Sequence, residues 1–136
     1  GLAVLAFATT NTASASAALS WIFFDAIRGR KPSAMGACIG AVVGLVAITP
    51  AAGFVSIGTS IFIGTFASII SNLVVHYKNK STLDDTLDVF PCHGVGGATG
   101  MLLTGIFATT IVNSAGANGL LYGGMQLFLN HLIALL

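Results

Sequence analysis

The chain is divided into long apolar runs that are separated by short polar loops. The runs cover approximately residues 2–27, 33–49, 54–76, 88–112 and 121–136. A transmembrane helix needs about 20 mostly apolar residues, and it satisfies its own backbone hydrogen bonds where no water is present. Four runs meet or approach this length, and a fifth begins near the end of the chain. The pattern predicts an all-α, polytopic membrane helix bundle with four complete spans and part of a fifth.

The overall composition supports a membrane protein. Hydrophobic residues make up 55% of the chain, charged residues only 7%, and the mean hydropathy is +0.94. A soluble domain carries roughly a quarter charged residues. The formal net charge of +1 gives no reason to expect a nucleic-acid partner. Cys38 and Cys92 lie in apolar runs without metal-ligand spacing, so we expect inert buried thiols and neither a disulfide framework, a metal site nor a cofactor.

The two ends of the chain suggest a piece of a longer protein. Gly1 is not an initiator methionine and no basic segment precedes the first run, so residues 2–27 do not read as a signal peptide. Leu136 lies inside an apolar run with no polar residue after it. We therefore expect residues 1–136 to be one membrane domain fragment of a larger polytopic protein.

The basic residues predict an orientation in the membrane. All of them lie after the first or the third run, and they are Arg28, Arg30, Lys31, Lys78 and Lys80. Loops on the cytoplasmic side of a membrane carry an excess of lysine and arginine. We therefore expect a multi-pass cell-membrane protein in which loops 28–32 and 77–87 face the cytoplasm and loops 50–53 and 113–120 face outside.

Small residues predict close packing between the helices. Gly36, Gly40 and Gly44 recur every four residues and share one helix face, and Gly96 and Gly100 have the same spacing. Membrane helices gain little from transferring apolar side chains out of lipid, so close backbone approach across small residues supplies much of their packing. We interpret these glycines as packing positions, with a functional role for any one of them as the alternative.

The polar side chains in the first run are expected to have different bonding partners. Its serine and threonine hydroxyls are expected to bond to their own helix backbone, whereas Asn11 is the better candidate for a bond between helices. Asp25 is three residues before Arg28 and could pair with it at the surface, where an ion pair contributes little.

One ionisable side chain lies within a glycine-rich apolar stretch, which reads Asp88-Val-Phe-Pro-Cys-His93-Gly-Val-Gly-Gly-Ala-Thr-Gly100. His93 is ~7 Å of helix rise beyond Asp88. Ionisable groups are costly in lipid and usually face the bundle interior or a pore. A neutral imidazole offers one donor and one acceptor nitrogen, so it can bind an N–H solute or relay a proton. His93 is therefore the candidate pore residue, and a hydrogen bond to a neighbouring helix is the alternative.

Three other ionisable residues are candidates for an interfacial, functional or structural role. His76 ends the third run at the expected cytoplasmic interface and is interpreted as an interfacial anchor. His131 lies in the incomplete fifth run, where its depth is undefined, and is a weaker functional candidate. Asp88 is predicted to cap the helix that carries His93, with Pro91 in the first turn, and a cation site at a pore mouth is the alternative.

Two blocks of this sequence resemble the ammonium transporter (Amt/Mep/Rh) family. The block Asp84-Asp-Thr-Leu-Asp-Val-Phe-Pro-Cys-His-Gly-Val-Gly-Gly-Ala-Thr-Gly-Met-Leu-Leu-Thr-Gly-Ile-Phe-Ala108 is similar to the family's tenth transmembrane segment. Residues 36–55 resemble its eighth segment and the loop that follows. The resemblance covers essentially the whole chain, which would then hold segments seven to ten and the start of eleven, from the second half of an eleven-helix inverted-repeat transporter.

The resemblance carries functional implications. It implies a homotrimer in the lipid bilayer, with an apolar pore in each subunit that takes ammonium or methylammonium. The resemblance also implies that ammonium is deprotonated before ammonia is conducted. His93 matches the second of two pore histidines, Val89 an apolar pore-lining position, and Asp88 an acidic residue at the start of that helix. The other histidine and the external recruiting site belong to segments absent from this chain. A PII-type protein is implied as a partner on the cytoplasmic face.

Three alternatives are kept beside this reading. The first is an ammonium-sensing membrane domain fused to a signalling module, and a Rh-type gas channel is a near variant of the main reading. The second is a different secondary transporter, although such carriers often place charged residues deep in their spans and this chain does not. The third, an intramembrane enzyme, is disfavoured because His93 has no nucleophile or metal-binding partner in the sequence.

Overall fold

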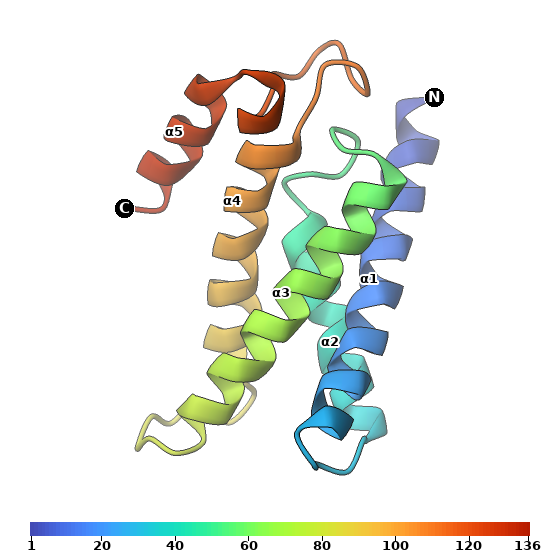
Figure 1. Ribbon diagram of the computed structural model, residues 1–136. Coiled ribbons are helices and arrows are strands. Elements are labelled where there is room, and N and C mark those ends of the chain that lie inside the picture. The colour runs from blue at the N-terminus through green and yellow to red at the C-terminus, as the bar shows by residue number, and fades with distance from the viewer.

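The computed structural model describes residues 1–136, and all of its regular secondary structure is helical (Figure 1). The three longest helices are α1 (Leu2–Ile27), α2 (Ala34–Ile48) and α3 (Ile57–Lys78). A π-helical turn, Phe90–Val95, leads directly into α4 (Gly96–Phe107). A short 3-10 turn, Leu120–Tyr122, precedes α5 (Met125–Ala134). Of these helices, α1 and α3 are long and apolar enough to cross a membrane, whereas α2 and α5 are shorter apolar helices.

Serine residues define where α2 and α3 begin. The hydroxyl of Ser33 accepts a hydrogen bond from the amide of Gly36 at 3.0 Å, and the hydroxyl of Ser56 accepts one from the amide of Thr59 at 3.2 Å. Each hydroxyl thereby satisfies one of the amides that have no partner at a helix start. The turn between the two helices contains Gly53, whose positive φ of 82° suits glycine.

The fourth apolar run is helical over a shorter stretch than its expected limits of 88–112. Helix α4 ends at Phe107, and Ala108 is extended. The amide of Thr109 donates to the carbonyl of Phe54 at 3.0 Å, and the carbonyl of Ala108 accepts from the amide of Gly119 at 2.7 Å. The backbone leaves the helix here because its polar groups bond to other segments of the chain instead.

The core of the bundle is made mostly of small side chains at the contacts of α1 with α2 and α3. Ala13, Ala17, Ala47 and Ala67 are fully buried. A methyl group added at Gly44 would stand 2.5 Å from the carbonyl oxygen of Ala13, which is closer than atoms in contact allow. The helix backbones therefore touch almost directly, as expected for packing in an apolar solvent.

Hydrogen bonds between helices are made by residues other than the one expected. Asn11 donates to the carbonyl of Phe7 in its own helix at 2.8 Å, so its predicted role as a bridge is wrong. Ser14 instead donates to the carbonyl of Ala41 at 3.2 Å, and Ser68 donates to the carbonyl of Ala17 at 2.8 Å. Because the helix backbones lie so close together, these hydroxyls can reach and donate to carbonyl groups of the neighbouring helix.

The predicted pairing of Asp25 with Arg28 is also wrong. Asp25 is buried and stands 3.4 Å from Arg30 Nη1, while Arg28 lies over the ring of Phe24, 5.5 Å from its centroid. Helix α1 ends before Arg30, and the turn at Gly29 brings the Arg30 guanidinium back toward the carboxylate.

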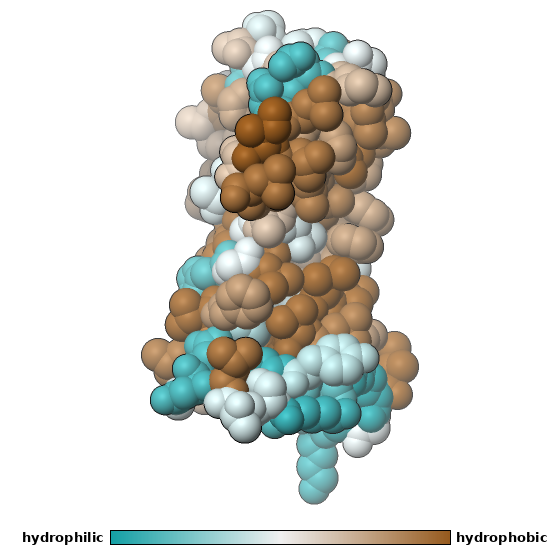
Figure 2. Space-filling view, turned by 90° about the vertical axis from the view of Figure 1, so that its left-hand side faces the viewer, coloured by the Kyte–Doolittle hydropathy of each residue, from teal (hydrophilic) through white to brown (hydrophobic).

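The charged residues gather at one end of the bundle. The loop between α1 and α2 and the loop between α3 and the π-helical turn both lie at the lower end in Figure 1, and the other two loops lie at the upper end. The five basic and four acidic residues all lie in the lower two loops or in the helix ends that adjoin them. Figure 2 shows hydrophilic residues at this end, a largely hydrophobic surface above it, and a smaller hydrophilic patch near the opposite end.

Candidate functional site

The helix that carries His93 begins with a cap from Asp85. One carboxylate oxygen of Asp85 accepts from the amide of Val89 at 2.9 Å, and the other accepts from the amide of Phe90 at 3.0 Å. The prediction that Asp88 caps this helix is therefore wrong. Asp88 has a positive φ of 53°, and its carboxylate pairs with the ammonium group of Lys78. A capping side chain needs an extended backbone at its own residue, which Asp88 does not have.

His93 lies within the π-helical turn Phe90–Val95. Such turns are rare, and they occur frequently at functional sites. Pro91 stands near the start of this turn, where its missing amide leaves no hydrogen bond unmade. This turn is not predictable from the sequence, because the wider helical winding leaves no periodic signal over six residues.

The imidazole of His93 borders an apolar cavity. The cavity has a volume of about 190 Å³ and is lined by Cys38, Ile39, Val42, Leu87, Cys92 and His93. Helix α2 supplies the first three of these residues, so the cavity lies between α2 and the π-helical turn. A neutral imidazole in these surroundings can exchange hydrogen bonds with a small solute that carries N–H groups.

Val89 lies four residues before His93 but does not line this cavity. Val89 is 50% exposed and His93 is also exposed, so residues 1–136 cover each of them only in part. The structure thus leaves the two predicted pore residues partly exposed at the start of the same helix.

The glycines of this helix pack against α2. Gly100 approaches the backbone of Ala47 so closely that a methyl group there would overlap the Ala47 carbonyl. Gly96 is packed less tightly, because an added methyl group would stand 3.6 Å from Val43 Cγ1 and from Ser71 Oγ. On α2, methyl groups at Gly36 and Gly40 would stand 3.1 Å and 2.7 Å from the Trp21 side chain. The contacts of Gly96 and Gly100 hold the helix of His93 against α2, and those of Gly36 and Gly40 hold α2 against α1.

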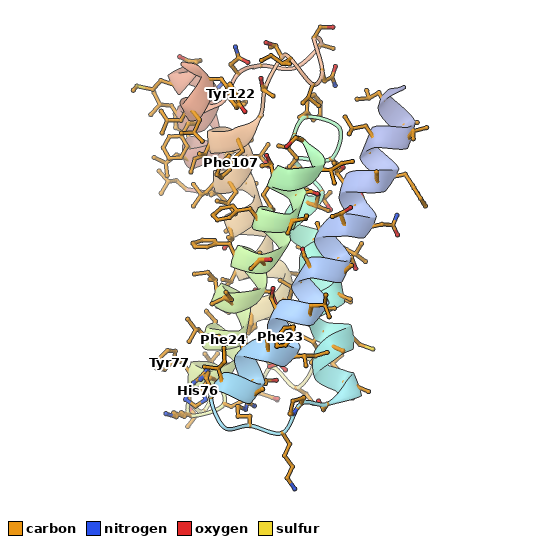
Figure 3. The ribbon with its side chains drawn as sticks, turned by 45° about the vertical axis from the view of Figure 1, so that its right-hand side comes forward. Phe23, Phe24, His76, Tyr77, Phe107 and Tyr122 are labelled. Atoms are coloured by element: carbon orange, nitrogen blue, oxygen red, sulfur yellow. The ribbon has the colours of Figure 1, made fainter.

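The remaining histidines occupy opposite ends of the bundle. His76 packs edge-on against Tyr77, with 5.7 Å between ring centroids, at the charged end (Figure 3). His131 Nδ1 is 2.7 Å from the carbonyl oxygen of Met101, and since a carbonyl only accepts, Nδ1 carries the hydrogen and donates. His131 also borders a cavity of about 390 Å³ together with Phe54 and Thr104.

Comparison with known proteins places this arrangement in a family. The model of the Ammonium Transporter Family matches residues 1–136. The chain is 48% identical to an ammonium transporter of Bacillus subtilis over 136 residues, which are 99% of this chain and 34% of that protein. The chain belongs to the ammonium transporter family. This membership assigns it to a class of transporters and not to a class of enzymes.

Solved structures of ammonium transporters have the same fold. The crystal structure of Saccharomyces cerevisiae Mep2 superposes with a TM-score of 0.87 at 38% identity, over 98% of this chain and 32% of Mep2. A structure described as a sensor Amt protein superposes with a TM-score of 0.81 at 25% identity, over 98% of this chain and 33% of that one. The chain spans about a third of the length of the relatives it matches.

Proposed function

We propose that residues 1–136 form one side of an ammonium conduction pathway, in which His93 and Val89 line an apolar pore. The observation that carries this proposal is the position of His93, an exposed histidine beside an apolar cavity on a helix that is fixed against α2. In a transporter of ammonium, a wall of this kind would meet the permeating species.

The apolar surroundings favour a neutral solute. A bare cation is costly to bring into a low-dielectric passage. Ammonium would therefore transfer a proton to water at the pore mouth before entry, and ammonia would pass along the imidazole by exchanging hydrogen bonds with it. Methylammonium carries the same N–H donors and would follow the same route.

The surrounding assembly is part of the same proposal. By resemblance, the chain corresponds to segments seven to ten and the start of eleven of an eleven-helix transporter, which works as a homotrimer. Residues 2–27, 33–49 and 54–76 would be complete spans, as would the helix that starts after Asp88 and ends at Phe107, and residues 121–136 would be the start of the next span. Loops 28–32 and 77–87 would face the cytoplasm, where a PII-type regulator would dock.

Replacement of His93 tests the proposed pore. In the full-length protein, His93→Ala should change ammonium-dependent currents and the ratio of ammonium to methylammonium uptake, because the imidazole no longer exchanges hydrogen bonds with the solute. His76→Ala is the matched control, since His76 packs on Tyr77 at the charged end and should leave both quantities unchanged. Uptake and selectivity that stay at wild-type values in His93→Ala would overturn the proposal.

A sensing role is the second candidate function, and the match to the sensor Amt structure supports it. Currents recorded from the full-length protein in a lipid bilayer separate the two functions. A conducting transporter gives currents that increase with ammonium concentration, whereas a dedicated sensor binds ammonium without steady current.

A further inference from the structure

Lys78 makes a bridge between the end of α3 and the start of the helix that carries His93. It is the last residue of α3. Its ammonium group donates to the backbone carbonyl of Asp85 and to the carboxylate of Asp88. The side chain of Lys78 is 10% exposed and that of Asp88 is 18% exposed, so water screens this pair much less than a surface pair.

Both partners of Lys78 are part of the start of that helix. The carbonyl of Asp88 accepts from the amide of Cys92 at 3.0 Å, next to His93 in the chain. Asp85, whose carbonyl Lys78 holds, supplies the carboxylate that caps Val89 and Phe90. Lys78 thus holds both Asp85, which caps this helix, and Asp88, whose carbonyl accepts the first backbone hydrogen bond of the helix.

The backbone at Asp88 needs this support. Its φ of 53° lies in the left-handed region, which costs residues other than glycine of order 1 kcal/mol or more and persists where surrounding contacts hold it. The pair with Lys78 is such a contact. Lys80, two residues further on, makes no ion pair and no side-chain hydrogen bond, so the arrangement belongs to Lys78 and not to basic charge in the loop generally.

We infer that Lys78 is a positioning residue for His93. By holding Asp85 and Asp88 in place, it sets where the π-helical turn begins and therefore where the imidazole stands relative to α2. This inference rests on the proposed role of His93 in conduction. Lys78 does not itself contact the solute, and its effect on transport passes through His93.

Transport measurements on the full-length protein test the inference. Lys78→Met and Asp88→Asn should each change the ratio of ammonium to methylammonium uptake in the same direction. Lys78→Arg should retain most of the wild-type ratio, because a guanidinium can donate to the same two oxygens. Lys80→Met is the matched control and should leave the ratio unchanged. In a His93→Ala background, Lys78→Met should cause no further change in selectivity.

A second measurement reports on the start of this helix and does not depend on transport activity. Cys92 is 5% exposed and precedes His93, so its thiol reports opening of the π-helical turn. In a full-length background with Cys92 as the sole cysteine, Lys78→Met should raise the rate of thiol modification by about tenfold or more, since removing one partner of a poorly exposed ion pair leaves the other charge uncompensated. Asp25→Asn weakens a different buried contact at the same end of the bundle and should leave this rate unchanged.

The outcomes separate this inference from the proposed function. If His93→Ala changes selectivity but Lys78→Met changes neither selectivity nor the Cys92 rate, the positioning role is overturned and the pore role stands. If Lys78→Met still alters selectivity after His93 is removed, the lysine acts by another route and the inference is wrong. If His93→Ala itself has no effect on transport, the proposed function fails, and the Cys92 rate then shows whether Lys78 holds the turn at all.

Discussion

Asn72 donates a hydrogen bond from Nδ2 to Asp25 Oδ1 at 3.1 Å, and this contact joins α3 to α1 near the charged end of the bundle. Asn72 is fully buried and Asp25 is 6% exposed. Arg30 approaches the same oxygen of Asp25 from the loop, at 3.4 Å. A buried carboxylate is tolerated when charged and polar donors surround it, so this cluster fixes two helices and one loop together.

Removing Asp25 should destabilise the protein. Asp25→Ala leaves the Asn72 amide without a partner in the core and releases Arg30, and a buried donor left unsatisfied costs about 1–3 kcal/mol. We expect a lower midpoint of thermal unfolding for the purified full-length protein, followed by tryptophan fluorescence. Asp84→Ala is the control, because Asp84 lies in an exposed loop. Equal midpoints for the two variants would contradict the role of the Asp25 cluster.

Gly100 should not accept even a methyl group. Gly100→Ala places a carbon atom against the Ala47 carbonyl, and such overpacking typically costs about 1–3 kcal/mol through displacement of the backbone. The helix of His93 would separate from α2. Gly58→Ala is a matched control in α3, where only Ser56 Oγ lies near the added atom, at 3.9 Å. Resistance to unfolding in detergent should fall for Gly100→Ala and stay the same or rise for Gly58→Ala.

His131 should contribute to stability and not to selectivity. His131→Phe removes the hydrogen bond to Met101 that ties α5 to α4, and a net loss of about 1 kcal/mol is typical for one such bond. Limited proteolysis should therefore cut the variant faster between α4 and α5. The ratio of ammonium to methylammonium uptake should match that of the wild type, and a changed ratio would mean that His131 contacts the permeating solute.

The orientation proposed from loop charges can be measured directly. In a full-length background from which Cys38, Cys92 and any other cysteine have been removed, a single cysteine introduced by Ser114→Cys in the loop between α4 and α5 should react with a membrane-impermeant maleimide added to intact cells. The same substitution at Ser81, in the loop after α3, should react only after the cells are opened. Labelling of Ser81→Cys in intact cells would reverse the assignment of the two faces.

Much of the helical layout could be predicted from the sequence. The first apolar run coincides with α1, since an uninterrupted apolar segment of this length has few other stable forms in a membrane. The glycine repeat on α2 likewise pointed to close packing, and Gly40 and Gly44 do face the backbone of α1. These features depend on local sequence, where period and residue size carry the information.

The details around His93 could not be predicted, because they depend on contacts between distant segments. Asp85 and Asp88 are both acidic and both near the helix start, and only the position of Lys78 decides which of them caps it. The helix ends at Phe107 because the chain beyond it bonds to the connection between α2 and α3. Neither the identity of the capping residue nor the end of α4 can therefore be predicted from the local sequence pattern.

The gathering of every formal charge at one end has a consequence for how the chain enters a bilayer. A membrane potential does work on each charge that crosses it, about 2.3 kcal/mol per elementary charge for 100 mV. Residues 49–56 and 108–119, which form the loops at the opposite end, contain no Lys, Arg, Asp or Glu. In the orientation proposed from the loop charges these two loops are the ones that cross the membrane, and the potential then does no work on their side chains, so it neither drives nor opposes their crossing.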